Sequence, residues 1–162
     1  MDADEPYRWR LWRRWAEAPP CVFVMLNPST ADDRHDDPTI RRCVGFARAW
    51  GFGGVEVVNL FALRATDPAD LRAAAAPVGA GNDAAIAAAV ARGRAGAIVV
   101  AWGVHGALHG RDREVAARLA PYRPRCLGVT RDGAPRHPLY VRADARAVPW
   151  SPPRPAPSRS GR

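Results

Sequence analysis

Apolar residues gather in four short runs along the chain, each rich in β-branched residues and bounded by residues that favour turns. These runs are CVFVML from Cys21, VEVVNLF from Val55, AIVVAW from Ala97 and RCLGVT from Arg125. Runs that stay apolar at nearly every position are typical of strands buried on both faces, as in a parallel sheet. The pattern therefore predicts four buried parallel strands.

Helical patterns lie between these runs. Asp37 can cap a helix that has Pro38 at its first position and ends at Gly51. The apolar residues of this helix recur at helical spacing: Ile40, Cys43, Val44, Ala47 and Trp50. Further helices are expected from Asp67-Pro68 through Leu71, from about Asn82 to Ala91 and from about Asp112 to Leu119. Because strands and helices alternate, we expect an α/β fold with a three-layer α/β/α arrangement around a central, mainly parallel four-stranded sheet.

The length of 162 residues fits one domain, which we expect to span residues 1–150. The segment 151–162 is rich in Pro, Ser and Arg, a composition that predicts a disordered tail. Three widely spaced cysteines make a disulfide framework a poor interpretation, so we expect reduced thiols in the core. The N-terminus lacks an apolar targeting segment, and no run approaches the ~20 apolar residues of a membrane span. We therefore expect a cytoplasmic protein with no membrane partner.

The formal net charge is +8, and the sequence pI is about 10.8. Three arginines lie in the segment 151–162 with no acid beside them, which leaves +5 for the rest. A basic balance favours a polyanionic partner. However, every basic residue is Arg and none is Lys, a bias typical of a GC-rich genome, so the charge alone decides little.

Residues suited to ligand contact follow the carboxyl end of each predicted strand. They are Asn27-Pro28-Ser29 after the first strand, Asn59 near the end of the second, Trp102 to His105 after the third, and Arg136-His137-Pro138 after the fourth. Parallel sheets bind ligands beyond the carboxyl ends of their strands. The sequence therefore predicts one functional cleft built around the Asn27-Pro28 turn.

Most of the chain resembles an uncharacterised bacterial family known as a domain of unknown function, family 1643. The similarity is carried by VMLNPSTADDRHDDPTIRRCVGFARAWGFGGVEVVNLFALRATDP, with AWG and PRHPLYV downstream. It covers nearly all of the chain up to Trp150. This resemblance implies a family without implying an activity.

A more distant similarity is to the uracil-DNA glycosylase superfamily. In that superfamily a Gly-x-[Asn/Asp/Glu]-Pro motif, an Asn-containing strand end, a Trp-Gly strand end and a His-Pro loop follow one another. The corresponding segments here, in the same order, are Met25-Leu26-Asn27-Pro28, Val57-Val58-Asn59-Leu60, Val100-Ala101-Trp102-Gly103 and Arg136-His137-Pro138. The resemblance implies a uracil-DNA-glycosylase-like fold and hydrolysis of an N-glycosidic bond in a nucleobase-containing substrate, such as uracil or another deaminated base in DNA.

The resemblance also implies roles for individual residues. As catalytic residues, Asn27 would orient the attacking water, and His137 would donate a hydrogen bond to the base as negative charge develops there. Asn59 would read the edge of an extruded pyrimidine, and Phe46 or Trp50 would stack on it. The remaining substrate-binding residues would be Pro28, Ser29, Trp102, His105 and Arg136.

Two features depart from the superfamily pattern. Met25 stands where the first motif has Gly, and Leu139-Tyr140 follow the His-Pro where many relatives have Ser-Pro and a wedge loop that enters DNA. Three scattered cysteines cannot supply the four ligands of an iron-sulfur cluster, so no cofactor is expected. The expected partner is a nucleobase-type ligand, either alone or within single- or double-stranded DNA. The oligomeric state is left open.

Three alternatives stay beside this interpretation. The first is a non-catalytic module that binds a base, a nucleotide or nucleic acid on the same fold. The second is a metal-dependent hydrolase using the acidic run 32–37 around His35, although its spacing matches no ligand pattern and we assign no metal ligand. The third concerns the run 7–15, whose cations and aromatics suit single-stranded nucleic acid. For that run we prefer an edge strand, with Tyr7, Trp9 and Leu11 facing inward and Arg outward.

Overall fold

A computed structural model describes residues 6–28, 31 and 34–153. Within these residues, six strands form one mixed sheet in the order β1-β3-β2-β4-β5-β6. The strands are β1 (Leu11–Arg14), β2 (Pro20–Met25), β3 (Gly54–Asn59), β4 (Ala97–Val100), β5 (Arg125–Cys126) and β6 (Val148–Pro149). The inner strands β3, β2, β4 and β5 pair in parallel, whereas β1 and β6 pair with their neighbours in the antiparallel sense.

The sheet differs from the predicted one in its number of strands and in the direction of its edge strands. Each of the four apolar runs contains a strand, but two antiparallel edge strands extend the sheet to six. β5 is also short: of the run from Arg125, Arg125–Cys126 alone pair as a strand, and Gly128 follows with a φ of +116°. This left-handed backbone conformation favours glycine and takes the chain out of the sheet.

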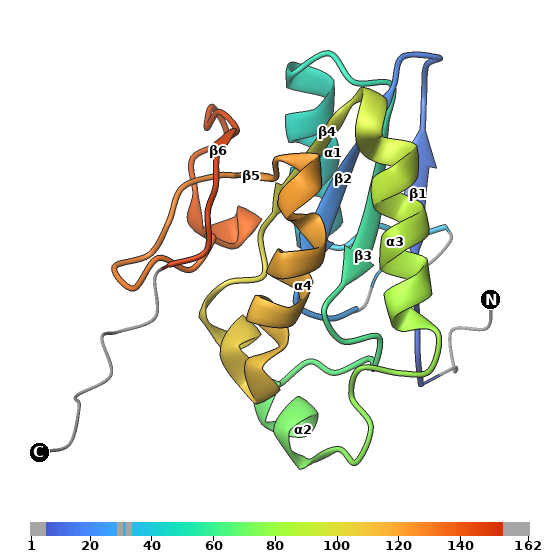
Figure 1. Ribbon diagram of the computed structural model, residues 1–162. Coiled ribbons are helices and arrows are strands. Elements are labelled where there is room, and N and C mark those ends of the chain that lie inside the picture. Colours follow the sequence, from blue (N-terminus) through green and yellow to red (C-terminus); the bar gives the residue numbers. More distant parts are fainter. Residues whose placement is uncertain (1–5, 29–30, 32–33, 154–162) are drawn as a thin grey trace, which may run out of the picture.

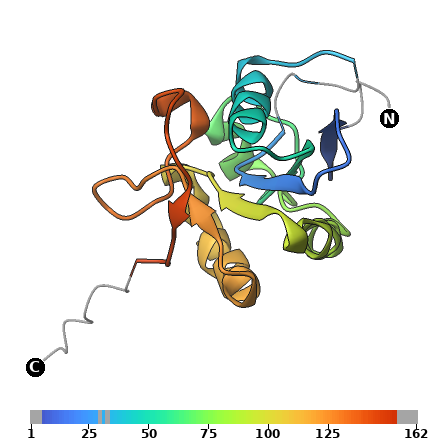
Figure 2. The same cartoon turned by 90° about the horizontal axis from the view of Figure 1, so that it is seen from above.

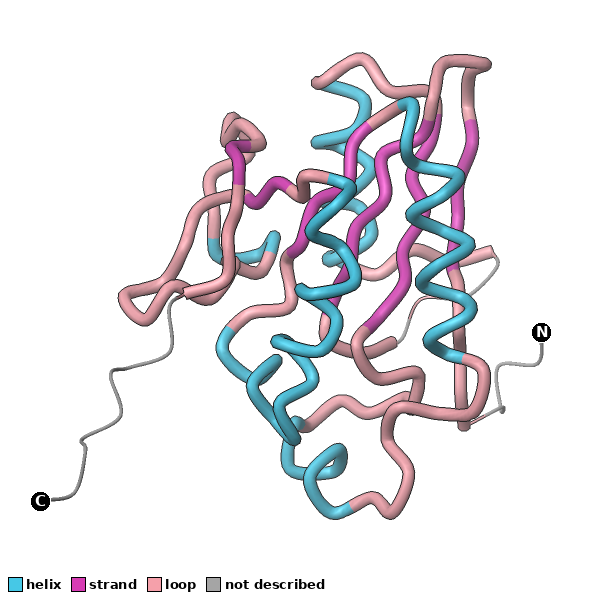
Figure 3. The backbone as a smooth tube through the Cα atoms, in the orientation of Figure 1, coloured by secondary structure: helices cyan, strands magenta, loops and turns pink. Residues whose placement is uncertain are grey.

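Helices cover both faces of the sheet, with α1 on one face and α3 and α4 on the other, as Figures 1 and 2 show from two directions. The α-helices are α1 (Pro38–Ala49), α2 (Pro68–Ala73), α3 (Asn82–Arg92) and α4 (Arg111–Leu119). Short 3₁₀ segments are η1 (Gly93–Ala95), η2 (Val104–Gly110), η3 (Ala120–Tyr122) and η4 (Pro138–Tyr140). In Figure 3, long loops join these elements beyond the carboxyl ends of the strands.

Local sequence signals explain where two of the helices begin. Asp37 is the N-cap of α1, and its Oδ1 accepts a hydrogen bond from the Ile40 backbone N–H at 2.8 Å. Asp67 caps α2 in the same way through the Ala69 backbone N–H at 2.9 Å. In both helices a proline occupies the first position, where its missing N–H has no cost. The predicted starts of α1 and α2 are therefore confirmed.

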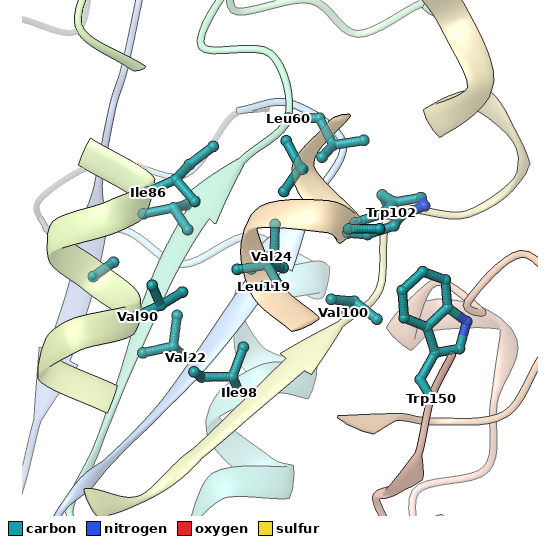
Figure 4. Packing of buried hydrophobic residues seen from close by; sticks show 14 of the residues in the cluster. Val22, Val24, Leu60, Ile86, Val90, Ile98, Val100, Trp102, Leu119 and Trp150 are labelled. Atoms are coloured by element: carbon teal, nitrogen blue, oxygen red, sulfur yellow. The ribbon is translucent and has the colours of Figure 1, made fainter. Parts of the chain in front are cut away.

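The strands divide the core into two layers because their side chains alternate between the faces of the sheet. Val22 and Val24 of β2 pack toward α3 and α4, whereas Cys21 and Phe23 pack toward α1. Figure 4 shows the first of these layers, where Trp102 meets Trp150 edge to face. All three cysteines are buried and free, as the sequence predicted.

The edge strand β1 is confirmed over Leu11–Arg14, but one arginine of the run is buried and does not face outward as expected. Arg8 is 3% exposed, and its guanidinium donates to the Ala31 carbonyl. The rings of Tyr7 and Trp9 are half-buried and hydrogen-bond to the backbone carbonyls of Ala76 and Ala80, at 3.0 and 2.8 Å. These contacts support the structural interpretation of this run. In the described part of the chain, no helix is long and apolar enough to cross a membrane.

Candidate functional site

A cavity of about 760 Å³ opens at the carboxyl ends of β2, β3 and β4, on the side of the sheet that α1 covers. It collects most of the residues predicted from the sequence: Asn27, Pro28, Asn59, Trp102, His105, Arg136 and His137. Polar residues that the sequence did not single out for this site also line it: Arg8, Asp37, Thr39, Thr66, Thr130 and Tyr140. The volume lies in the range of pockets that bind small molecules.

Asn27 follows β2 and is half-buried. Its Nδ2 donates to the Ala65 carbonyl at 2.6 Å and to the Pro28 carbonyl at 3.1 Å. Two carbonyl acceptors fix the orientation of the amide, because only the NH₂ end can donate to them. The Oδ1 of Asn27 therefore points away from these carbonyls as an acceptor, and the amide ties the turn after β2 to the loop after β3.

Asn59 ends β3 beside Met25 of β2, and it lines the cavity with only 4% of its surface exposed. Its side-chain amide makes no hydrogen bond with any residue that the structure describes, and its atoms are open to the cavity because they are not among the fully buried polar atoms that lack a partner. A buried amide is normally hydrogen-bonded, so an amide on a cavity wall without a protein partner is available to a ligand.

The backbone at the end of β3 is clamped from the far side of the sheet. Asn82, fully buried at the start of α3, donates through Nδ2 to the carbonyls of Asn59 and Leu60 at 2.9 and 3.1 Å. Arg111, 2% exposed at the start of α4, donates to the Leu60 carbonyl at 2.8 Å and pairs with Asp83 at 2.7 Å. These contacts fix the position from which the Asn59 side chain enters the cavity.

His137 lies immediately before η4 and is half-buried. Its Nδ1 accepts a hydrogen bond from the Leu139 backbone N–H at 3.2 Å. In the neutral ring the proton then sits on Nε2, which becomes a donor. Burial lowers the pKa of His137 from its ordinary value of 6.5, while the charge of Asp37 acts in the opposite direction. His137 is therefore a neutral hydrogen-bond donor at pH 7.

Two charged residues that the sequence did not assign to the site also line the cavity. Asp37, 7% exposed, combines its capping role with a place on the wall. Arg8, 3% exposed, comes from the segment before β1, whose backbone is fixed by a hydrogen bond from Arg8 N to the Ala62 carbonyl at 2.8 Å. Arg136 adds a third charge, and its Nε donates to the Val129 carbonyl at 3.0 Å.

The aromatic side chains do not lie as expected. Phe46 does not line the cavity: it is 1% exposed in the core beneath α1, with its ring centroid 5.2 Å from that of Trp50. Trp102 lines the cavity but is 2% exposed, and its ring packs against Trp150 in the other core layer. The aromatic residue at the cavity rim is Tyr140, which is 79% exposed and lies 5.8 Å from His137 between ring centroids.

The remaining predicted residues divide between the rim and the undescribed segments. His105 is exposed where η2 begins, at the edge of the cavity. Ser29 lies outside the described residues, as do Asp32 and Asp33 of the acidic run. The Asp36 carboxylate of that run binds the Arg13 guanidinium at 2.8 Å. Within the described residues, no group of three or more His, Cys, Asp or Glu side chains is placed to hold a metal ion.

Fold and cavity together define an α/β protein with a ligand-sized pocket beyond the carboxyl ends of parallel strands. A family model described as "Protein of unknown function (DUF1643)" matches residues 8–139, and the chain belongs to this family. The match takes in all the described residues singled out above as lining the cavity, except Tyr140. Comparison with curated proteins and with solved structures finds no match for the chain.

Proposed function

We propose that this protein is an N-glycosyl hydrolase with a uracil-DNA-glycosylase-like fold, which acts on a nucleobase-containing substrate such as uracil or another deaminated base in DNA. The main support for the proposal is the side-chain amide of Asn59. This residue lies on the cavity wall with 4% of its surface exposed, and no described residue forms a hydrogen bond with its amide. Leaving a buried amide unsatisfied costs on the order of 1–3 kcal/mol. A ligand that completes its hydrogen bonds would account for keeping it there.

The chemistry of the amide favours a nucleobase among small ligands. A carboxamide presents a donor and an acceptor side by side, which complements the adjacent donor and acceptor groups on the Watson-Crick edge of a pyrimidine such as uracil. Apolar Met25 and Val57 lie on the same wall as Asn59 and suit the face of a flat ring. A cavity of about 760 Å³ leaves room for the attached sugar.

The other polar groups suit the cleavage step. Breaking an N-glycosidic bond leaves negative charge on the departing base, and a neutral His137 with its proton on Nε2 can stabilise that charge without transferring the proton. Asn27 offers Oδ1 to a water molecule, because its Nδ2 is already held by Pro28 and Ala65. In this scheme Asn27 orients the water and His137 stabilises the leaving group.

The proposal is tested by measuring release of free base from oligonucleotides that carry uracil, hypoxanthine or xanthine, each in single- and double-stranded form. Release is expected with at least one of these bases, and Asn27→Ala and His137→Ala are expected to abolish it. His109→Asn is the matched control, because His109 is exposed and does not line the cavity. Absence of release from every substrate would count heavily against the proposal.

A second candidate is a binding module that keeps the base pocket without hydrolysis. Asn27 favours this candidate, because its carboxamide cannot take a proton and its NH₂ group is hydrogen-bonded to two backbone carbonyls. Calorimetry with uracil and deoxyuridine separates the two. Binding that depends on Asn59, together with no release of base from any substrate, would support the module and exclude the hydrolase.

A further inference from the structure

Asp37 is a carboxylate on the cavity wall that is 7% exposed. One of its oxygens, Oδ1, caps α1 by accepting from the Ile40 backbone N–H at 2.8 Å. An ionised carboxylate offers about four acceptor positions on its two oxygens, and the helix cap uses one of them. Among the described residues that line the cavity, Asp37 is the sole carboxylate.

The hydrolysis proposed above requires an acceptor for a proton of the attacking water. Asn27 cannot serve, because a carboxamide has no useful basicity. Arg8 and Arg136 are permanently charged donors. His137 already uses Nδ1 to accept from Leu139, and its Nε2 carries the proton. His105 lies exposed at the edge of the cavity, so Asp37 is the buried group of the cavity wall with the chemistry of a base.

Asp37 and His137 also lie within electrostatic reach of each other. The negative charge of Asp37 raises the pKa of His137 and partly opposes the effect of burial. The element that holds Asp37 supports this proximity, because α1 packs against η4, the 3₁₀ turn that His137 caps. The two side chains therefore line the same cavity from two elements that pack together.

Resting on the proposed function, we propose that Asp37 is the general base of the hydrolysis. A water that donates one hydrogen to Asn27 Oδ1 gives its other proton to the Asp37 carboxylate as its oxygen bonds to the anomeric carbon. The C–N bond breaks, and its electron pair leaves with the base, where the His137 Nε2–H stabilises the charge. The proton on Asp37 then passes to the departed base, which regenerates the carboxylate.

Asp37→Asn separates catalysis from capping, because Asn is as good an N-cap as Asp but cannot take a proton. The measurement is the single-turnover rate of base release on the best oligonucleotide substrate of the wild-type protein. Removal of a general base is expected to lower this rate by about 10²–10⁴-fold. The melting temperature and the affinity for free uracil are expected to stay unchanged. Asp67→Asn, which alters the equivalent cap of α2, is the control and is expected to keep the wild-type rate.

Two further variants keep the test decisive if Asp37→Asn folds poorly. Asp37→Ser also retains a good cap, and Asp37→Gly is a tolerated cap that opens space beside the water. Added formate is expected to restore part of the rate of Asp37→Gly and to leave the wild-type rate unaltered. A folded Asp37 variant whose rate stays within about threefold of wild type would overturn this inference and leave the hydrolase standing. A wild-type protein that releases no base would overturn the hydrolase itself, and this inference with it.

Discussion

Replacing Asn59 with leucine is expected to make the protein more stable while removing its ligand binding. Asn59 is 4% exposed, and the structure gives its amide no hydrogen-bond partner among the described residues. Leucine has the same branched arrangement of side-chain heavy atoms as asparagine but no polar group, so it removes the cost of an amide without a protein partner. That cost is on the order of 1–3 kcal/mol. We expect a gain of about 1 kcal/mol, because cavity water offsets part of the cost in the wild-type protein.

The gain can be measured as a melting temperature. For a domain of this length, 1 kcal/mol corresponds to a shift of about 2–4 °C, so Asn59→Leu is expected to melt about 2–4 °C above wild type. Asn82→Leu is the matched control: Asn82 is fully buried, and its Nδ2 holds the carbonyls of Asn59 and Leu60. Its loss leaves two buried acceptors without their donor and is expected to destabilise the protein by about 2 kcal/mol or more.

Thermal unfolding by calorimetry, paired with titration of uracil into the same variants, decides the matter. A melting temperature that falls in Asn59→Leu as it does in Asn82→Leu would show that the Asn59 amide is satisfied within the folded protein and is not held there for a ligand. The melting temperature is expected to rise in Asn59→Leu and to fall in Asn82→Leu, so the two variants give opposite results at two buried asparagines. Such a gain in stability on loss of binding is typical of residues kept for function.

Three further outcomes are expected. Phe46→Ala is expected to destabilise the protein by about 3–5 kcal/mol, measured by urea unfolding, with unaltered affinity for uracil in the folded fraction, because Phe46 packs in the core against Trp50. Burial lowers the pKa of His137, so the unfolded chain binds a proton at this histidine more readily than the folded protein does. The contribution to the free energy of unfolding is therefore expected to be full above about pH 6.5 and to fall as the pH drops below it. His137→Gln is expected to make the free energy of unfolding less dependent on pH in this range. Burial also raises the pKa of the Cys21 and Cys43 thiols, so an alkylating reagent is expected to label them only after unfolding.

The helices α1 and α2 could be predicted because their signals are local. An aspartate followed by proline fixes the start of each helix, whatever the rest of the chain does. The inner strands were visible for a related reason: they are buried on both faces, so their apolar runs are unbroken. β6 carries no such signal, because Val148 and Pro149 are both exposed at the sheet edge.

Most of the cavity residues could be located because parallel strands bring their carboxyl ends to one edge of the sheet. The sequence placed Asn27, Asn59 and His137 together by this rule alone, although it could not give their partners. Asp37 was missed as a site residue because its capping role already explained it. A residue that caps a helix beside a predicted cleft can serve both purposes, and the sequence contains no sign that separates them.

Arg8 and Phe46 were misplaced for opposite reasons. Strict alternation along the N-terminal run predicted Arg8 outside, but β1 begins only at Leu11, and the preceding segment is held by a backbone hydrogen bond to Ala62 that no local pattern announces. Phe46 lies on the apolar face of α1, where helical periodicity predicts burial in the core. Applied consistently, that periodicity would have removed Phe46 from the predicted site.

The central claim is that Asn59 and His137 share one nucleobase in the cavity. A crystal structure of the protein soaked with deoxyuridine tests it most directly. We expect the uracil edge within hydrogen-bond distance of the Asn59 amide, a base oxygen facing His137 Nε2, and the sugar toward Asn27. Deoxyuridine bound elsewhere on the protein, or a cavity that stays empty at saturating deoxyuridine, would contradict it.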